Sequence, residues 1–148
     1  MNNNDKVVFS DLEIGDEFPE ITVEITQEVI DVAALAHLDF NPVHTAVDWA
    51  ERAQVFGTPK TVAHGMFTMS GMVSVVLRHW GKSGTAIVGI DGKLTRPVPV
   101  GSTVTTTGSI KELHPRSPGQ DIVVVGVKAV DQDDNIVGVG SVRVRVGS

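Results

Sequence analysis

Two short segments carry side chains that could perform acid–base chemistry. The first is Asp39-Phe40-Asn41-Pro42-Val43-His44, which places a carboxylate and an imidazole five residues apart. Because Pro42 forces the residue before it out of the α region, the segment must be turned, and both side chains can converge on one volume. A carboxylate beside an imidazole holds its tautomer and suits it to give or take protons near neutral pH. Asp39 and His44 are therefore candidate acid–base residues, with an Asx turn and a surface histidine as the simpler alternative.

The second segment is Ala63-His64-Gly65-Met66, at the start of a long helical stretch. A glycine in a helix costs about 1 kcal/mol relative to alanine, so Gly65 indicates that something approaches the backbone closely there. First-turn amides lack intrahelical acceptors and lie at the positive end of the helix dipole, which suits them to hold an oxygen that gains negative charge. The alternatives are that Gly65 and Gly71 let a strand cross the helix, which we prefer for Gly71, and that His64 is a hydrogen-bonded helix-start residue.

Apolar periodicity predicts three helices around these segments. Thr26 is a predicted N-cap, and an apolar stripe carries the first helix to about Leu38. A short helix is predicted over 46–54. The stretch 62–80 is apolar nearly all round, which predicts a buried central helix. A transmembrane span is the competing interpretation, but the run is too short for one and contains His, Gly, Thr and Ser residues.

The rest of the chain has the pattern of strands, rich in Val, Ile and Thr and bounded by turn residues. The predicted strands cover 21–25, 86–90, 94–98, 103–113, 121–130 and 136–146, with 131–135 as a hairpin loop. We therefore expect an α+β fold in which an antiparallel sheet wraps around the central helix. Such a sheet has open edges, and edge pairing between two copies would cover them, so a homodimer is expected.

Composition limits the possible classes of protein. The 148 residues and 41% hydrophobic content predict a single globular domain over 1–148. The chain has no cysteine, which excludes disulfides, thiolate nucleophiles and Cys-ligated metals and is consistent with a cytoplasmic protein. The polar amino terminus, Met1 to Asp11, has no pattern of a secretory signal. No pair of histidines has zinc-like spacing with a third ligand, and neither Ser70 nor Ser74 sits in a nucleophile elbow, so we expect no metal, no cofactor and no serine triad.

The charge is unevenly distributed along the chain. Residues 1–58 hold 2 bases and 12 acids, a net charge of −10, whereas residues 59–148 hold 10 bases and 6 acids, a net charge of +4. The formal net charge of −6 argues against nucleic acid as a partner, because phosphate backbones require a clustered basic surface. The basic excess after residue 58 could meet a smaller anionic ligand, although a solvated strand face is the simpler interpretation.

Together, Asp39-x-Asn41-Pro42-x-His44 and Ala63-His64-Gly65-Met66 resemble the paired signature of the MaoC-like (R)-specific enoyl-CoA hydratases of the hotdog superfamily. The resemblance is specific over 27–80, and Phe56-Gly57-Thr58-Pro59 and the stretch 96–101 also match the family pattern. The layout is similar to the catalytic subunits of bacterial (3R)-hydroxyacyl dehydratases, which run the same reaction in reverse. The resemblance thus implies a hotdog fold that pairs as a double-hotdog dimer and acts on acyl-CoA or acyl-carrier-protein thioesters.

The resemblance also implies roles for single residues. Asp39 and His44 would be the catalytic pair that adds water to C3 of a trans-2-enoyl thioester, and the Gly65 amide would contact the thioester oxygen. Asn41 would order the loop or touch substrate, and His64 is grouped with Gly65 as a candidate oxyanion or substrate-binding residue. Among the basic residues after residue 58, Lys93 and Arg96 are candidates to bind the phosphates of coenzyme A.

One departure from the family pattern concerns the residues before Asp39. The family usually has Ser-Gly there, whereas this chain has His37-Leu38. Because leucine does not adopt a positive φ cheaply, we expect a different path into the loop or a different acyl pocket. Two alternatives to a hydratase follow from the same fold: a catalytically silent subunit that binds acyl thioesters, and a hotdog thioesterase.

Overall fold

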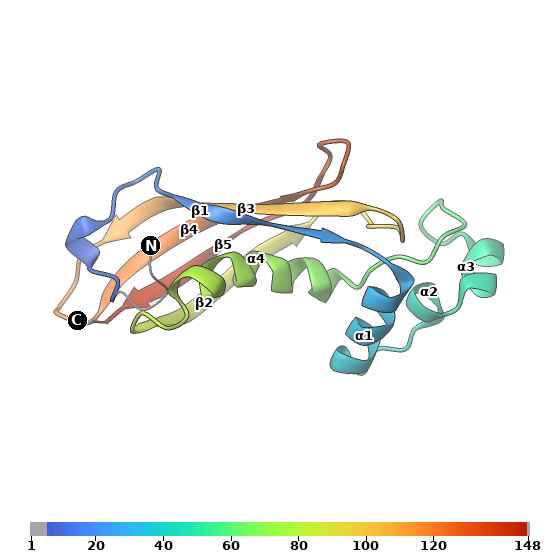
Figure 1. The fold of residues 1–148 in the computed structure, drawn as a ribbon, viewed down its shortest axis with the longest axis horizontal. Helices are drawn as coiled ribbons and strands as arrows, with labels where there is room; N and C mark the ends of the chain where they lie inside the picture. The colour runs from blue at the N-terminus through green and yellow to red at the C-terminus, as the bar shows by residue number, and fades with distance from the viewer. Residues whose placement is uncertain (1–5, 148) are drawn as a thin grey trace.

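Five antiparallel strands form one sheet in the spatial order β1-β3-β4-β5-β2, and the helix α4 lies along one of its faces (Figure 1). The computed structural model describes residues 6–147. A short 3₁₀ helix, η1, precedes the sheet, and three short helices lie together beyond one end of α4 (Figure 1). The elements in chain order are η1 (Phe9–Asp11), β1 (Glu17–Glu24), α1 (Gln27–His37), α2 (Pro42–Thr45), α3 (Val47–Ala53), α4 (Gly65–Trp80), β2 (Thr85–Leu94), β3 (Thr103–His114), β4 (Asp121–Val130) and β5 (Ile136–Val146).

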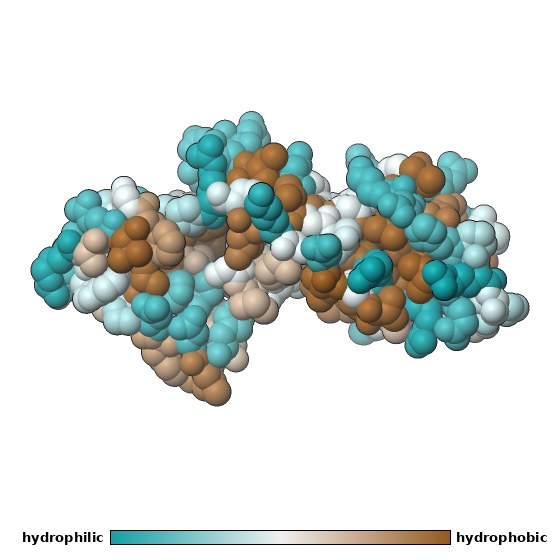
Figure 2. Space-filling model, turned by 180° about the vertical axis from the view of Figure 1, so that it is seen from behind, coloured by the Kyte–Doolittle hydropathy of each residue, from teal (hydrophilic) through white to brown (hydrophobic). Residues whose placement is uncertain are grey.

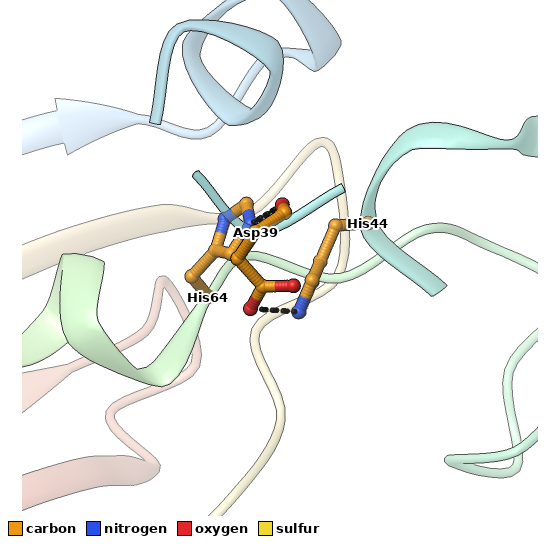
Figure 3. Close-up of side chains that lie close together, drawn as sticks. All are labelled: Asp39, His44 and His64. Atoms are coloured by element: carbon orange, nitrogen blue, oxygen red, sulfur yellow. Dashed lines mark hydrogen bonds and ion pairs between the residues drawn. The ribbon is translucent and has the colours of Figure 1, made fainter. Parts of the chain in front are cut away.

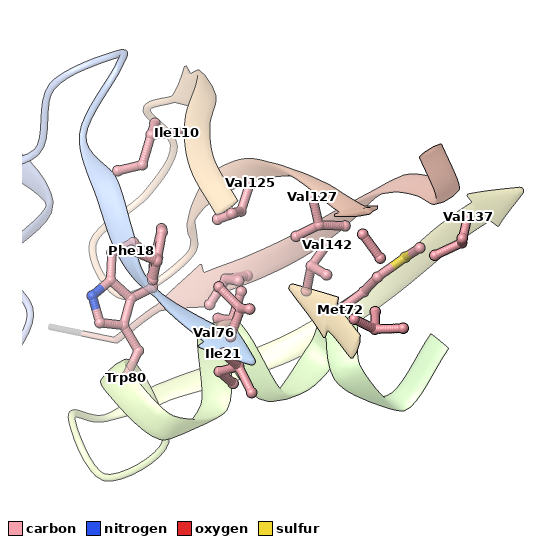
Figure 4. Packing of buried hydrophobic residues seen from close by; sticks show 14 of the residues in the cluster. Phe18, Ile21, Met72, Val76, Trp80, Ile110, Val125, Val127, Val137 and Val142 are labelled. Carbon is pink, nitrogen blue, oxygen red and sulfur yellow. The ribbon is translucent and has the colours of Figure 1, made fainter. Parts of the chain in front are cut away.

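The core lies between α4 and the sheet face that it covers (Figure 4). Met72, Val75, Val76 and Trp80 on α4 are each at most 6% exposed. The strands contribute alternate residues, as period-2 burial requires, and most of these are valines: Val104, Ile110, Val123, Val125, Val127, Val142, Val144 and Val146. The α+β prediction of an antiparallel sheet around a central helix, the hotdog arrangement, is confirmed.

The central helix begins three residues later than predicted. Residues 62–64 are not helical, because Val62 forms an isolated bridge with Pro99 and the Ala63 amide donates to the Val98 carbonyl over 2.8 Å. These long-range bonds hold the chain extended up to the N-cap His64. The helix therefore starts at Gly65. Residues 62–64, which the apolar pattern assigned to the helix, precede it as an extended segment.

The predicted strands 86–90 and 94–98 are instead one strand followed by a loop. β2 runs continuously over Thr85–Leu94 and pairs with β5, with a register shift between Ile87 and Gly89. Residues 95–98 leave the sheet and carry the chain past Ala63. The strands β4 and β5 and the hairpin loop between them occur at the predicted positions.

The expectation that α4 is buried all round holds for only part of its surface. Met66 is 60% exposed and Leu77 is 50% exposed, and Val88 and Ile90 on the edge strand β2 are about half exposed. Viewed from behind, hydrophobic patches lie on the half of the molecule that holds the sheet and α4 and also on the half that holds the three short helices (Figure 2). The single chain therefore leaves apolar surface open on α4 and beside a free sheet edge. No helix within 6–147 is both long and apolar enough to span a membrane.

Candidate active site

The loop between α1 and α2 is shaped by its own side chains. Asp39 Oδ1 accepts a hydrogen bond from the Asn41 amide, and Asn41 Oδ1 accepts one from the Val43 amide, each over 3.2 Å. Asn41 is thereby the N-cap of α2, with Pro42 as the first helical residue. The Asx turn considered as the simpler alternative is present, and the same turn directs the Asp39 and His44 side chains toward each other.

Leu38 ends α1 in the left-handed conformation, with φ 55° and ψ 35°. Leu38 therefore adopts the positive φ that is costly for leucine, and the expectation of a different path into the loop or a different acyl pocket stays a prediction. The main-chain amide of Asp39 donates to the Ala34 carbonyl over 3.0 Å, which closes the helix end in the usual left-handed capping geometry. The Leu38 side chain is 79% exposed and is not among the residues that line the cavity described below.

Asp39 and His44 converge as the sequence predicted (Figure 3). Asp39 Oδ2 lies 3.8 Å from His44 Nε2, and the side chains are 50% and 12% exposed. That separation exceeds a direct hydrogen bond and leaves both atoms able to contact one water molecule. On the other side of the ring, His44 Nδ1 lies 2.7 Å from the Val62 carbonyl oxygen. Since a carbonyl only accepts, Nδ1 carries the proton in the neutral ring, and Nε2 presents its lone pair toward Asp39.

His64 is buried behind this pair, with 3% of its surface exposed. Its Nε2 donates to the Asp39 main-chain carbonyl over 2.9 Å, and its ring stacks on the ring of His44 at a centroid distance of 3.8 Å. The ring of His37 packs edge-on against the ring of His64, at a centroid distance of 5.4 Å. Among the described residues, His64 Nδ1 has no hydrogen-bond partner. His64 therefore contacts both members of the acid–base pair through its buried ring, whereas its predicted contact with a substrate stays untested.

Gly65 is the first residue of α4, and its N-cap residue makes no side-chain capping bond. A Cβ at this position would overlap the end of the Leu94 side chain, so the close approach that the glycine indicated is made by a β2 side chain. For Gly71, a Cβ would meet the hydroxyl of Thr106 on β3, in agreement with a strand crossing the helix there. The main-chain amide at position 65 lies in the first turn, where helical geometry supplies no acceptor.

A cavity of about 440 Å³ joins His44 to Gly65. Apolar side chains make up much of its wall, as in most pockets that bind small molecules. The lining residues are His44, Phe56, Val62, Ala63, Gly65, Thr68, Leu94, Thr95, Arg96, Pro97 and Val98. A larger hollow of about 650 Å³ lies over β1, β3, β4 and β5 and includes none of the predicted site residues, so the smaller cavity is the candidate site.

The two basic candidates differ in position. Arg96 lines the cavity, whereas Lys93 does not. Leu94 and Gly92 face α4, so Lys93 between them points to the opposite face of the sheet. Arg96 is also close enough to Asp131 for its charge to help lower the pKa of that carboxyl.

One donor atom each from Asp39, His44 and His64 lies within 4.8 Å of the others, a spacing that could hold a metal ion. Two of the ring nitrogens in this group are already hydrogen-bonded to main-chain carbonyls. Of the four ring nitrogens only His44 Nε2 and His64 Nδ1 are free of those bonds. The prediction that the protein needs no metal stays a prediction.

Two polar residues beside the site were missed by sequence reasoning. Gln27, the first residue of α1, and Thr61, before the cavity-lining Val62, hydrogen-bond to each other over 2.6 Å. Gln27 also donates to the main-chain carbonyl of His44. No sequence signal pointed to them, because they lie 34 residues apart and neither belongs to a recognisable motif.

Comparisons with known proteins agree with this architecture. A family model described as MaoC like domain matches residues 11–133. The structure is similar to R-hydratase PhaJ1 from Pseudomonas aeruginosa, with a TM-score of 0.83 and 23% identity over 95% of this chain and 85% of that one. It is similar to an (R)-hydratase from A. caviae involved in PHA biosynthesis, with a TM-score of 0.78 and 19% identity over 91% and 97% of the two chains. A monoamine oxidase regulatory protein from Archaeoglobus fulgius gives a TM-score of 0.84 and 22% identity over 100% and 99%. A search of curated proteins gave no match.

Proposed function

This chain belongs to the MaoC-like domain family, and from its site geometry we propose that it catalyses the (R)-specific hydration of a trans-2-enoyl-CoA, or the reverse dehydration of a (3R)-hydroxyacyl-CoA. The observation that carries the proposal is the approach of Asp39 Oδ2 to within 3.8 Å of His44 Nε2, beside a cavity that reaches Gly65. His44 and Gly65 both line this cavity, and Asp39 adjoins it through His44. An acid–base pair and a helix-start amide around one cavity suit the addition of water to a conjugated thioester.

In the proposed reaction, a water molecule binds between Asp39 Oδ2 and His44 Nε2. The pair takes one proton from it, and the oxygen forms a bond to C3 as the C2–C3 π electrons move toward the thioester carbonyl. The Gly65 amide hydrogen-bonds the carbonyl oxygen as it becomes negative. The carbonyl then re-forms and C2 takes a proton from the pair, so one water has been added in all. Because the two groups are coupled, the proton belongs to the pair rather than to either residue.

The remaining predicted residues have supporting roles in this proposal. Asn41 orders the loop, since its side chain caps α2. His64 supports the pair from behind through its contacts with Asp39 and His44. Arg96, at the cavity wall, is the candidate for a phosphate group of the thioester's carrier, either coenzyme A or an acyl carrier protein.

We also propose that the functional unit is a pair of such chains. The supporting observations are the free edge of β2 and the exposed apolar side chains beside it on β2 and α4. Unpaired edges and apolar patches are commonly covered by a second copy. Sedimentation equilibrium gives the mass in solution, and a monomer at micromolar concentration would contradict this part of the proposal.

The experiment that tests the function is a panel of trans-2-enoyl-CoA chain lengths, with matching acyl-carrier-protein thioesters, followed by loss of the conjugated enoyl absorbance. Chiral analysis of the product should give the (3R) alcohol. The variants Asp39→Asn and His44→Ala should each abolish turnover, and unchanged turnover in both would overturn the site assignment. Release of free thiol from acyl-CoA without hydration would identify a thioesterase instead. Binding of acyl-CoA without either reaction would identify a silent subunit.

A further inference from the structure

We propose that Gln27 and Thr61 are positioning residues that hold His44 in the tautomer and orientation needed for proton transfer. The inference rests on the proposed function for the role of His44, but the arrangement itself consists of hydrogen bonds around one side-chain amide. Neither residue lines the cavity, so neither is expected to touch the substrate.

Both polar atoms of the Gln27 side-chain amide form hydrogen bonds. Its Nε2 donates to the His44 main-chain carbonyl over 2.9 Å and to Asp31 Oδ1 over 2.8 Å, and its Oε1 accepts from the Thr61 hydroxyl over 2.6 Å. A carbonyl and a carboxylate can only accept, so the amide nitrogen must face them and the amide oxygen must face Thr61. The orientation of the amide is therefore determined, and the hydroxyl of Thr61 must be the donor.

Thr61 connects the Gln27 amide to the ring of His44 through the main chain of the next residue. Thr61 is 1% exposed, and the next residue, Val62, supplies the carbonyl that accepts from His44 Nδ1 over 2.7 Å. The Val62 amide donates in turn to the Val43 carbonyl over 3.1 Å. Gln27 thus joins the main chain of His44 to the extended segment 61–62, whose Val62 carbonyl binds the ring of the same residue.

The consequence is a fixed distance between the His44 backbone and the acceptor of its ring proton. While the Val62 carbonyl stays in place, Nδ1 carries the proton and Nε2 faces Asp39 as the basic nitrogen. Without the Gln27–Thr61 contact, the two segments lose their side-chain connection and the ring can turn or change tautomer. A supporting partner of a functional histidine generally fixes its tautomer and orientation in this way.

Three variants test the inference. Gln27→Met keeps the length of the side chain without its amide, Thr61→Val keeps the shape of the side chain without its hydroxyl, and Thr61→Ser restores the hydroxyl. Gln27→Met and Thr61→Val should lower kcat by roughly 10- to 100-fold, because small misplacements of a catalytic group cost that much. KM should change little, since the acid–base pair of Asp39 and His44 acts mainly in the transition state. Thr61→Ser should recover most of the loss.

Matched controls separate positioning from general damage. Gln120→Met and Thr107→Val make the same chemical changes at an exposed loop residue and on the sheet, away from the cavity. Both should retain the wild-type kcat. Thermal unfolding of every variant identifies any that fails to fold. If Thr61→Ser and Thr61→Val both fold, the difference between their kcat values reports the effect of the hydroxyl group.

A second readout does not depend on activity. Long-range proton–nitrogen NMR of the imidazole rings should report His44 as the Nδ1-protonated form in the wild type and a mixture of tautomers in Gln27→Met and Thr61→Val. Folded variants with unchanged kcat and an unchanged His44 tautomer would overturn the inference. If the wild type hydrates no enoyl thioester but the tautomer changes as expected, the proposed function fails while the positioning role of Gln27 and Thr61 stands.

Discussion

The imidazole ring of His64 stacks on that of His44, with the ring planes 28° apart, while Nε2 of the same His64 donates to the main-chain carbonyl of Asp39. One buried side chain therefore contacts both members of the proposed acid–base pair. Asp39 lies on the loop between α1 and α2, where side chains are held less firmly than on a helix or strand, and His44 lies on the four-residue helix α2. A buried ring at the start of α4 gives that loop a rigid support.

Replacing His64 by phenylalanine should separate its two contacts. His64→Phe keeps a flat ring against His44 but removes the donor to Asp39, so we expect a loss of about 1 kcal/mol in the free energy of unfolding from the missing hydrogen bond. The kcat for hydration should also fall, because Asp39 loses its support. Urea unfolding and steady-state kinetics measure the two effects. Wild-type kcat in a folded His64→Phe protein would contradict the supporting role.

Gly65→Ala should show that Leu94 determines the need for glycine at the helix start. An added Cβ would overlap the end of the Leu94 side chain, and overpacking of this kind typically costs about 1–3 kcal/mol. Leu94→Ala removes the obstructing atoms, so the double variant should be more stable than the sum of the single effects indicates. A double-mutant cycle by urea unfolding measures this coupling. Strict additivity would mean that Leu94 moves aside freely.

Leu38→Gly should stabilise the protein. Leu38 has φ 55°, and an L-residue in the left-handed region costs about 1–2 kcal/mol that a glycine does not. Little packing is lost in exchange, because Leu38 is 79% exposed. We expect the free energy of unfolding to rise by up to about 1 kcal/mol after the added chain entropy of glycine in the unfolded state. A lower melting temperature for this variant would show that the Leu38 side chain makes a stabilising contact.

Asp131 should give the hairpin loop between β4 and β5 a pH-dependent stability. Desolvation raises the pKa of Asp131, but hydrogen bonds from the amides of Asn135 and Asp133, together with the Arg96 charge, leave it below the usual 3.8. A lowered pKa in the folded state stabilises the protein above the unfolded value, and this contribution is lost as the pH falls below 3.8 through the folded pKa.

The test compares wild type with Asp131→Ala by urea unfolding across the acid range. The variant should be less stable at neutral pH, where three hydrogen-bond donors, two main-chain amides and the Asn135 side chain, lose the Asp131 carboxylate. The difference between the two proteins should shrink as the pH falls below 3.8. A difference that stays constant over this range would assign the effect to packing rather than to the charge.

Arg96→Gln should raise the KM for an acyl-CoA substrate more than kcat falls, because Arg96 lines the cavity and is proposed to bind a phosphate group rather than to transfer a proton. Arg145→Gln, on an exposed position of β5, makes the same change outside the cavity and serves as the control. The effect of Arg96→Gln should weaken at high salt, since an exposed charge is screened. An unchanged KM would mean that the basic excess after residue 58 is a solvated surface.

Local sequence signals determined most of the secondary structure. The N-cap at Thr26, the proline at 42 and the valine-rich alternation after Gly81 act within a few residues, so the helix α1, the turn and the strands β4 and β5 occur where these signals predict. The pairing of Asp39 with His44 was also accessible, because five residues and one proline limit how far apart the two side chains can lie.

Only the tertiary structure decided the features that depend on distant partners. Val98 and Pro99 hold 62 and 63 extended, so α4 starts at Gly65, and the helix-closing bonds of Ala34 fix Leu38 in a conformation that its side chain disfavours. The contacts from Gln27, 17 residues from His44 and 34 from Thr61, left no local signal. Hydrogen bonds between segments far apart in sequence form only when the sheet and α4 bring them together. The sequence therefore determined which residues could react, and the fold determined which neighbours hold them.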